Sequence, residues 1–193
     1  NLFRYCRNAS QADCETSKSN FVAKITKPPA KPTRDSLRVV VRDQEYINSL
    51  IEYEKAGDGD LTIRDRIGDD LYALLAFDTV DSIGMLSTKS LDELGLSKAE
   101  AWALAKQQTA AHLPQLPTAA QLEKNAVGYE DNGYLGSLLV NREGWAKLAV
   151  EIGPDLFVTV VSDKFVFVGK MPAGPAFERF RQTVVEDCAS QER

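Results

Sequence analysis

The chain has 193 residues, of which 44% are hydrophobic and 26% charged, so it is long enough for one globular, soluble domain with a full core. No apolar run approaches the roughly 20 residues needed to cross a bilayer, which excludes a membrane span. Residues 1–42 carry nine basic and three acidic side chains, whereas the remainder carries 14 basic and 25 acidic ones, for a net charge of −5. Aromatic residues are not interleaved with the basic ones, and the acidic remainder repels phosphate, so we expect no nucleic-acid partner.

Residues 1–35 form a basic leading segment. Phe21, Val22 and Ile25 make a weak helical pattern, which the sequence KPPAKP at residues 27–32 follows. Prolines prevent a helix from continuing and favour an extended chain, so we interpret this stretch as a proline-rich linker or strap along the surface. The chain shows no secretory leader and begins without methionine, which indicates that a leader has been removed or that the sequence is trimmed.

The cysteines are Cys6, Cys14 and Cys188, too few and too scattered for a zinc site. Cys6 and Cys14 flank a polar stretch and can close a small loop in an oxidising compartment. The rival pairing joins one of them to Cys188, which falls in register with Phe177 and Phe180 on a predicted helix and can instead be a buried thiol. Reduced, structurally inert thiols are the remaining alternative.

We interpret residues 36–193 as a single α+β domain, which begins with a strand at residues 37–41 (LRVVV). Asp43 can cap a following helix, which two glycines end. A second amphipathic helix is predicted from four apolar residues that share one helical face: Ile67, Leu71, Leu74 and Leu75. Residues 80–87 are ambiguous but can form a strand.

Ser97 and Glu100 provide the clearest local signal, because a serine followed three residues later by glutamate makes a reciprocal capping box. The helix that they open is predicted to run to about His112 and to stop before Pro114. Residues 125–130 can form the next strand.

The last third of the chain predicts one or two helices within residues 134–152, ended by a Gly-Pro pair. A β-hairpin follows at about residues 155–169, and it is apolar at successive positions, which indicates a central hairpin covered on both faces. A helix after Pro175 closes the chain. The predicted fold class is therefore α+β, with a mixed or antiparallel sheet that includes this hairpin and several amphipathic helices packed against it.

No motif for catalysis or cofactor binding is found. His112 is the only histidine, which excludes a multi-histidine metal centre, and we interpret it as a half-buried or capping residue. The patterns GxSxG, HExxH, GxGxxG and GxxxxGK[ST] are absent. Residues 58–69 superficially resemble a calcium loop, but Ile63 stands where the sharp turn requires glycine. Arg64 and Arg66 would also compete for its carboxylates. We therefore predict no catalytic residue, no metal ligand and no cofactor.

Three stretches carry a family resemblance: the LRVVV strand with its helix at residues 37–55, LDELGLSKAEAWALAKQQT at residues 91–109, and YLGSLLVNREGWAKLAVEIGPDLFVTVVSDKFVFVG at residues 134–169. Over about residues 36–171 the chain resembles the YtpQ-like family of uncharacterised bacterial domains. Beyond the apolar pattern, the residues that carry the resemblance are Ser97, Trp102, Ser137, Leu138, Leu139, Trp145, Gly153 and Asp155. The resemblance implies a bacterial origin and an α+β fold, and it implies no activity.

Our first hypothesis is a non-enzymatic protein-interaction module of a bacterium, which binds an unidentified protein partner. The absence of catalytic motifs and the difference in charge between the leading segment and the body motivate it. Alanine replacement of Ser137, Asn141 or Asp163 is then expected to leave function intact. We expect a periplasmic or secreted location, with the cytoplasm as the alternative.

The alternative hypothesis is a carboxylate-based hydrolase that uses acidic residues of the 58–81 region, or Glu130 and Asp131. It requires two carboxylates that face one cleft, one of them with a raised pKa. A structural subunit of a larger assembly is a third reading, and the sequence does not indicate an oligomeric state.

Overall fold

The computed structural model describes residues 6–26, 31–57, 60–79, 82–130, 133–162 and 164–191. The chain divides into two compact units, Asn1–Lys31 and Pro32–Arg193. Arg34, which the sequence analysis placed in the leading segment, belongs to the second unit. There its carbonyl oxygen accepts a hydrogen bond from Gln108 Nε2 at 3.0 Å.

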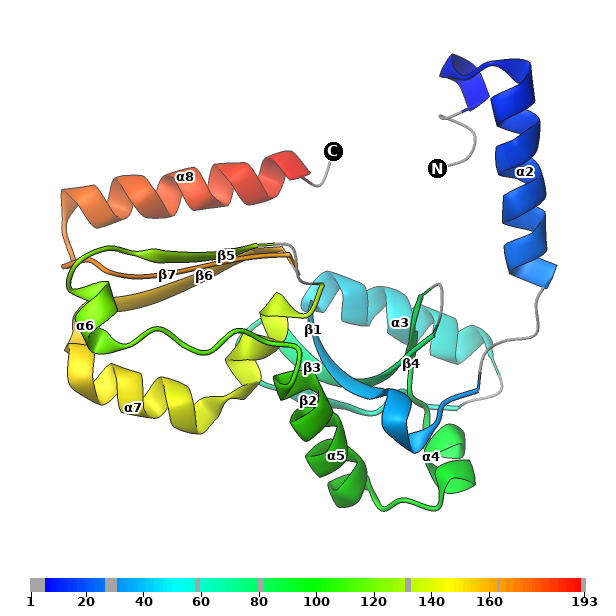
Figure 1. Ribbon diagram of the computed structural model, residues 1–193, viewed down its shortest axis with the longest axis horizontal. Helices are drawn as coiled ribbons and strands as arrows, with labels where there is room; N and C mark the ends of the chain where they lie inside the picture. The colour runs from blue at the N-terminus through cyan, green and yellow to red at the C-terminus, as the bar shows by residue number, and fades with distance from the viewer. Residues whose placement is uncertain are drawn as a thin grey trace. The chain divides into compact units, whose positions relative to one another are not determined.

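The first unit contains helix α2 (Gln11–Thr26) (Figure 1). Phe21 and Val22, which made the weak helical pattern in the sequence, lie in this helix with side chains 49% and 52% exposed. The helix ends directly before the proline-rich stretch, whose residues 27–30 lie outside the described part of the chain.

A disulfide joins Cys6 to Cys14 in the first unit. Of the pairings that the sequence left open, the structure therefore has the one that closes a small loop. This pairing leaves neither cysteine for Cys188, whose side chain lies outside the described residues.

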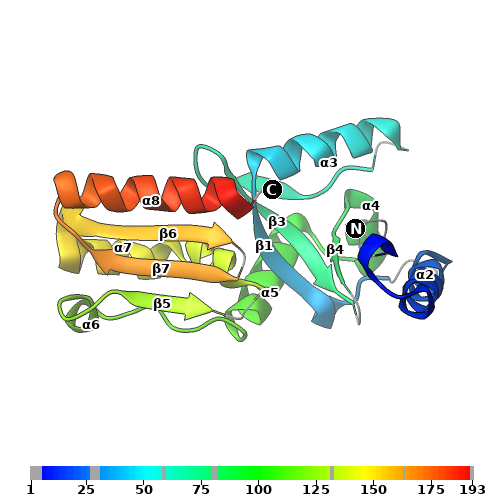
Figure 2. The same ribbon diagram turned by 90° about the horizontal axis from the view of Figure 1, so that it is seen from above.

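The second unit has the predicted α+β architecture, and its described part contains two antiparallel sheets (Figures 1 and 2). The strands of the first sheet are β1 (Leu37–Asp43), β2 (Arg64–Arg66), β3 (Leu71–Asp78) and β4 (Ile83–Met85), and those of the second are β5 (Val127–Glu130), β6 (Leu156–Ser162) and β7 (Phe165–Lys170). The helices are α3 (Gln44–Ala56), α4 (Thr88–Leu94), α5 (Lys98–Ala110), α6 (Ala119–Leu122), α7 (Arg142–Ile152) and α8 (Pro175–Gln191), and the 3-10 helices are η1 (Arg34–Ser36), η2 (Leu135–Val140) and η3 (Gly153–Asp155). Among the described residues, no helix combines the length and the apolar character that a membrane crossing requires.

The prediction of a second amphipathic helix is wrong, because its apolar residues Leu71, Leu74 and Leu75 belong to the strand β3. Leu75 packs in a cluster with residues of α5, whereas Leu74 packs in another with residues of α3. A strand that is buried on both faces is apolar at successive positions, and that spacing also matches one face of a helix.

The first sheet is organised around β3. β1 pairs with it in antiparallel register from Leu37 opposite Phe77 to Asp43 opposite Leu71, while β2 and β4 pair with successive parts of it. β4 confirms the strand that residues 80–87 can form. α3 covers one face of the sheet and α5 the other, so both faces are buried.

The predicted starts of α3 and α5 are both confirmed, because each is set by local hydrogen bonds. Asp43 Oδ1 accepts a hydrogen bond from the Tyr46 amide at 2.8 Å. In the capping box, the Ser97 amide donates to Glu100 Oε2 at 2.8 Å, and the Glu100 amide donates to Ser97 Oγ at 3.3 Å. These bonds satisfy amide groups that the first turn of a helix leaves free.

In the second sheet, β7 lies between β5 and β6, and β6 and β7 form the predicted C-terminal hairpin. Val166 and Val168 pack on one face in a cluster with Leu148 of α7. On the other face the ring of Phe157 lies 4.9 Å from that of Phe180 in α8. Figure 1 shows α8 and α7 on opposite faces of this sheet. The hairpin is thus covered on both faces, with β7 central and β6 at an edge.

η2 contacts β1 of the first sheet and β6 and β7 of the second, and together with α5 it covers the outer edge of β1 at Val39. Ser137 Oγ donates a hydrogen bond to the Val39 carbonyl at 2.8 Å, and the Val39 amide donates to Thr109 Oγ1 at 2.8 Å. All three residues are buried. Because an unpaired buried backbone group is costly, Ser137 and Thr109 have a structural role.

Candidate functional site: the groove between α5 and α7

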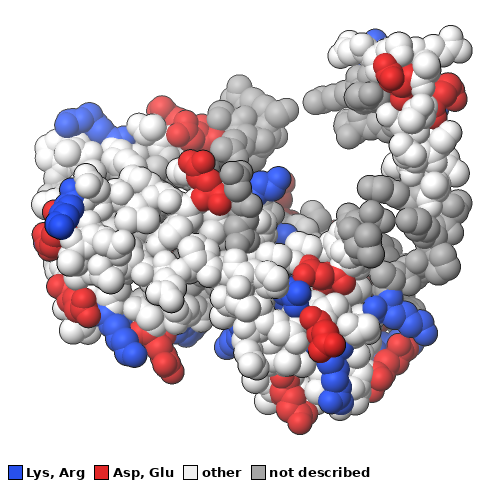
Figure 3. Space-filling view, viewed as in Figure 1, with Lys and Arg blue, Asp and Glu red and all other residues white. Residues whose placement is uncertain are grey.

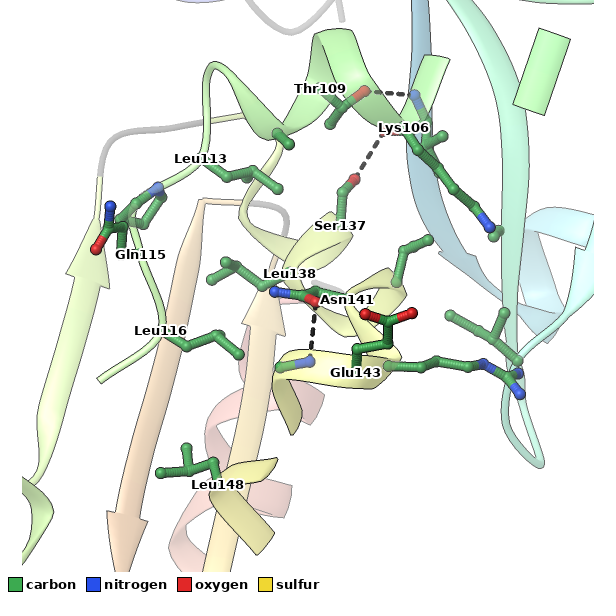
Figure 4. A pocket seen from close by; sticks show the side chains of 18 of the residues that line it. Lys106, Thr109, Leu113, Gln115, Leu116, Ser137, Leu138, Asn141, Glu143 and Leu148 are labelled. Carbon is green, nitrogen blue, oxygen red and sulfur yellow. Dashed lines mark hydrogen bonds between the residues drawn. The ribbon is translucent and has the colours of Figure 1, made fainter. Parts of the chain in front are cut away.

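A groove with a volume of about 1020 Å³ lies between α5 and α7, where the two sheets meet. We call it the α5–α7 groove. Its apolar lining includes Leu113, Leu116, Leu138 and Leu148. Charged side chains on its walls include Lys106, Arg142, Glu143, Lys147 and Glu151. Figure 4 shows the four leucines one after another along one side of the view, with Lys106 extending from α5 and Glu143 from α7.

The apolar lining depends on a close approach between α7 and the segment that follows α5. A Cβ atom added at Gly144 would lie 2.8 Å from Leu116 Cδ1 and 2.6 Å from Asn141 Nδ2, closer than real contacts allow. Glycine at position 144 therefore lets Leu116 pack against the start of α7. Leu138 and Leu148 are buried in the cluster against which Leu116 packs.

The α5 wall of the groove presents an aromatic residue and a cation. Lys106 Nζ lies 5.8 Å from the ring centroid of Trp102, within the range of a cation–π contact. Trp102 is 9% exposed, and its Nε1 has no hydrogen-bond partner among the described residues. Trp102 therefore contributes apolar surface to this wall, with a basic side chain above it.

The charges of the α7 wall are exposed and available. Arg142, Glu143, Lys147 and Glu151 make no hydrogen bond or ion pair within the described part of the chain through their side chains. By contrast, Asp65 of β2 is already paired, because its carboxylate accepts a hydrogen bond from Lys98 Nζ at 3.1 Å. Unpaired charges of both signs therefore stand along α7.

The hydroxyl groups of Ser137 and Thr109, which line the groove, already make hydrogen bonds within the chain. Ser137 and Thr109 bond the backbone of Val39, and Thr109 Oγ1 also donates to Ala105 O at 2.7 Å. Asn141 Oδ1 accepts a hydrogen bond from the Gly144 amide at 3.0 Å and so caps α7. These side chains position the groove and offer no activated nucleophile. Asp163, which we grouped with Ser137 and Asn141, lies outside the described residues.

His112 follows the end of α5, with its ring centroid 6.3 Å from that of Tyr134. Tyr134 donates a hydrogen bond to Asp78, whose second carboxylate oxygen pairs with Arg38 Nε at 2.8 Å. Burial and the neighbouring Asp78 carboxylate raise the pKa of Tyr134 well above that of an ordinary tyrosine. This network joins the loop before η2 to β1 and β3.

The acidic residues of the 58–81 region are distributed over different elements. Asp60 accepts hydrogen bonds from Thr88 Oγ1 at 2.9 Å and from the Lys89 amide at 3.0 Å, at the start of α4. Burial alone would raise the pKa of Asp60, but the hydrogen bonds it accepts outweigh this effect and lower the pKa. Asp65 pairs with Lys98, and Asp78 pairs with Arg38.

The remaining acidic residues that the hydrolase hypothesis names are exposed wherever the structure describes them. Asp69 and Asp70 are exposed in the turn before β3, and Glu130 is exposed at the end of β5. Asp58, Asp81 and Asp131 lie outside the described residues. Within the described ranges, no group of three or more histidine, cysteine, aspartate or glutamate side chains is arranged to hold a metal ion.

The buried carboxylate of the described chain is Glu54 in α3, away from the groove. It accepts hydrogen bonds from the Thr62 amide at 2.8 Å and from Arg64 Nη1 at 2.9 Å. Burial alone would raise the pKa of Glu54, but these hydrogen bonds and the Arg64 charge outweigh it and hold the pKa below its ordinary value. A carboxylate with a lowered pKa is a poor general acid, so Glu54 stabilises the fold.

Comparison of the chain with protein-family models, with curated proteins and with solved structures finds no match. The resemblance to YtpQ-like domains therefore stays a prediction.

The groove has no signature in the sequence as a whole, because its walls come from parts of the chain that only the tertiary fold brings together. One local signal was present: Glu143, Lys147 and Glu151 alternate in charge at four-residue spacing along one face of a predicted helix. That pattern also occurs on solvated helix faces, so it indicates a binding surface only in combination with the leucines that line the groove.

Proposed function

We propose that this chain is a non-enzymatic protein-interaction module of a bacterium, and that the α5–α7 groove binds a segment of its protein partner. The observation that carries the proposal is the combination of a leucine lining with unpaired, exposed charges of both signs on the α7 wall. An apolar centre with a charged rim is the usual composition of a protein interface.

The groove is large enough to hold a short peptide segment. Its volume of about 1020 Å³ stands at the upper end of the range of pockets for small molecules, roughly 300–1,000 Å³.

Figure 3 shows acidic and basic side chains intermixed over α4 and α5 on the face drawn. This composition suits a partner that carries both signs of charge better than a polyanion.

Site-specific photo-crosslinking in cells of the native host tests this function. A photo-reactive residue in place of Lys147 is expected to form a protein adduct, whereas one in place of Lys55, exposed on α3, is expected to form none. Adding Leu116→Asp should reduce the adduct about tenfold, because it places a charge in the apolar lining. Equal adducts at both positions, or none at position 147, would contradict the proposal.

We also propose that the chain functions in the periplasm or outside the cell, and the Cys6–Cys14 disulfide supports this location. Thiol titration of the denatured protein, purified without reductant, is expected to find one free thiol among the three cysteines. The fully reduced protein serves as the control, with all three thiols titrating. Three free thiols before reduction would place the chain in the cytoplasm instead.

A further inference from the structure

We infer, on the basis of the proposed function, that the partner segment is an amphipathic α-helix that lies along α7 with basic, acidic and basic side chains at four-residue spacing. This inference goes beyond the existence of a binding groove, because it states the secondary structure and the charge order of the ligand.

The charge order follows from the α7 wall. Glu143, Lys147 and Glu151 all line the groove and are spaced four residues apart, so they stand in one row along the helix. The row is about 12 Å long, at about 1.5 Å per residue. A helix that runs beside it meets acidic, basic and acidic charges in turn. Opposite charges at the matching positions of the ligand would then pair, as they do at the flanking positions of coiled coils.

These charges are available for a ligand. Glu143 and Lys147 have the spacing of an ion pair within one helix, yet the structure shows no ion pair between their side chains, nor between Lys147 and Glu151. All three are exposed. A ligand therefore gains these partners without breaking an existing pair in the described chain.

The α5 wall, which faces α7 across the groove, indicates which side chains the other side of the ligand carries. Lys106 of α5 lies over the Trp102 ring and leaves its charge directed to no carboxylate among the described residues. An acidic side chain of the ligand would meet Lys106, while apolar side chains would face Leu113, Leu116 and Leu138. The ligand is thus apolar on one face, basic–acidic–basic toward α7, and acidic toward α5.

A helix fits the groove better than an extended strand for two reasons. An added strand requires free backbone groups at a sheet edge. At the edge of β1 beside the groove, those groups belong to Val39, and the side chains of Thr109 and Ser137 already bond both of them. In addition, a helix about 10 Å across and about 12 Å long occupies roughly 1,000 Å³, which is similar to the groove volume of about 1020 Å³.

Two labelled peptides test the inference, because the natural partner is unidentified. Both are 15-residue helical peptides with the same leucine stripe. The first carries Lys-Glu-Lys at four-residue spacing beside the stripe, and the second carries Glu-Lys-Glu at those positions. Fluorescence anisotropy measures the dissociation constant of each peptide with the full chain. The first peptide is expected to bind about tenfold more tightly than the second, because three rim charges change from attraction to repulsion.

A charge-swapped variant supplies the decisive comparison. Glu143→Lys, Lys147→Glu and Glu151→Lys together should reverse the preference, so that the second peptide binds about tenfold more tightly. The matched control is Glu52→Lys, Lys55→Glu and Glu93→Lys, which makes the same change in net charge at exposed positions outside the groove. It should leave the preference unchanged.

The outcomes separate the inference from the proposed function. Equal binding of the two peptides, or a preference that the control variant reverses as well, overturns the charge order. If neither peptide binds while position 147 still crosslinks to a partner, the helical ligand is wrong and the groove remains the site. If position 147 also fails to crosslink, both the inference and the proposed function fall.

Discussion

Replacing Glu54 by glutamine is expected to lower the free energy of unfolding by about 3 kcal/mol at pH 7, because it leaves Arg64 without its counter-charge. The Glu54 side chain is 6% exposed and that of Arg64 is 24% exposed, so water compensates the arginine only in part. Urea unfolding followed by circular dichroism measures the loss.

The matched control for Glu54 lies on the same helix. Glu52 pairs with Lys55, but their side chains are 73% and 66% exposed. An exposed pair contributes little, so Glu52→Gln should change the free energy of unfolding by less than about 0.5 kcal/mol. Equal effects at positions 52 and 54 would mean that the buried pair does not stabilise the fold.

The contribution of Glu54 should also depend on pH. Its pKa in the folded chain is lower than its ordinary value of about 4.3, because the hydrogen bonds from Thr62 and Arg64 outweigh burial. The folded state therefore favours the ionised form, and the stabilisation is fully present above that ordinary pKa. It is lost as the pH falls through the lower folded pKa. The difference in stability between the wild type and Glu54→Gln should shrink over that acidic range.

The second prediction concerns Gly169, which lies opposite Phe157 in the pairing of β6 and β7. A Cβ atom at position 169 would lie 2.4 Å from Phe157 Cζ. The ring has little room to move, because it packs against Phe167 and Phe180. Gly169→Ala is therefore expected to displace the ring from beneath α8 and to lower the free energy of unfolding by about 2 kcal/mol. Thermal and urea unfolding measure this loss.

Gly128 in the neighbouring strand β5 provides the control for Gly169. A Cβ atom there would lie 3.7 Å from Phe167 Cδ2, an ordinary contact. Gly128→Ala should therefore keep or slightly raise stability, because alanine loses less backbone entropy on folding than glycine. If both alanine variants behave alike, the ring of Phe157 adapts freely and the packing argument fails.

The sequence predicted those parts of the fold that depend on local chemistry. The capping box at Ser97 and Glu100, and the cap at Asp43, each need only a few neighbouring residues, so both helix starts were correct. The prediction failed at β3, where burial on both faces made Leu71, Leu74 and Leu75 look like one side of a helix. A strand buried on both faces and an amphipathic helix are distinguished only by the elements that pack against the segment, which are α3 and α5 here.

The candidate site was less predictable than the fold. Ser137 was expected to tolerate alanine as an ordinary polar residue, yet it is buried and bonds Val39, 98 residues earlier in the chain. The close approach at Gly144 depends in the same way on Leu116, which reaches α7 only in the folded chain. Neither contact has a local signature, because each joins segments that the sequence separates widely.

The hydrogen bonds at Val39 also bear on the order of folding. They connect β1 to Thr109 and Ser137, which follow it by 70 and 98 residues, and contacts of such long range form slowly. Each sheet can pair its own strands before this junction closes. A nascent chain in which the junction is still open has no groove, so the partner binding that we propose requires that the junction has formed.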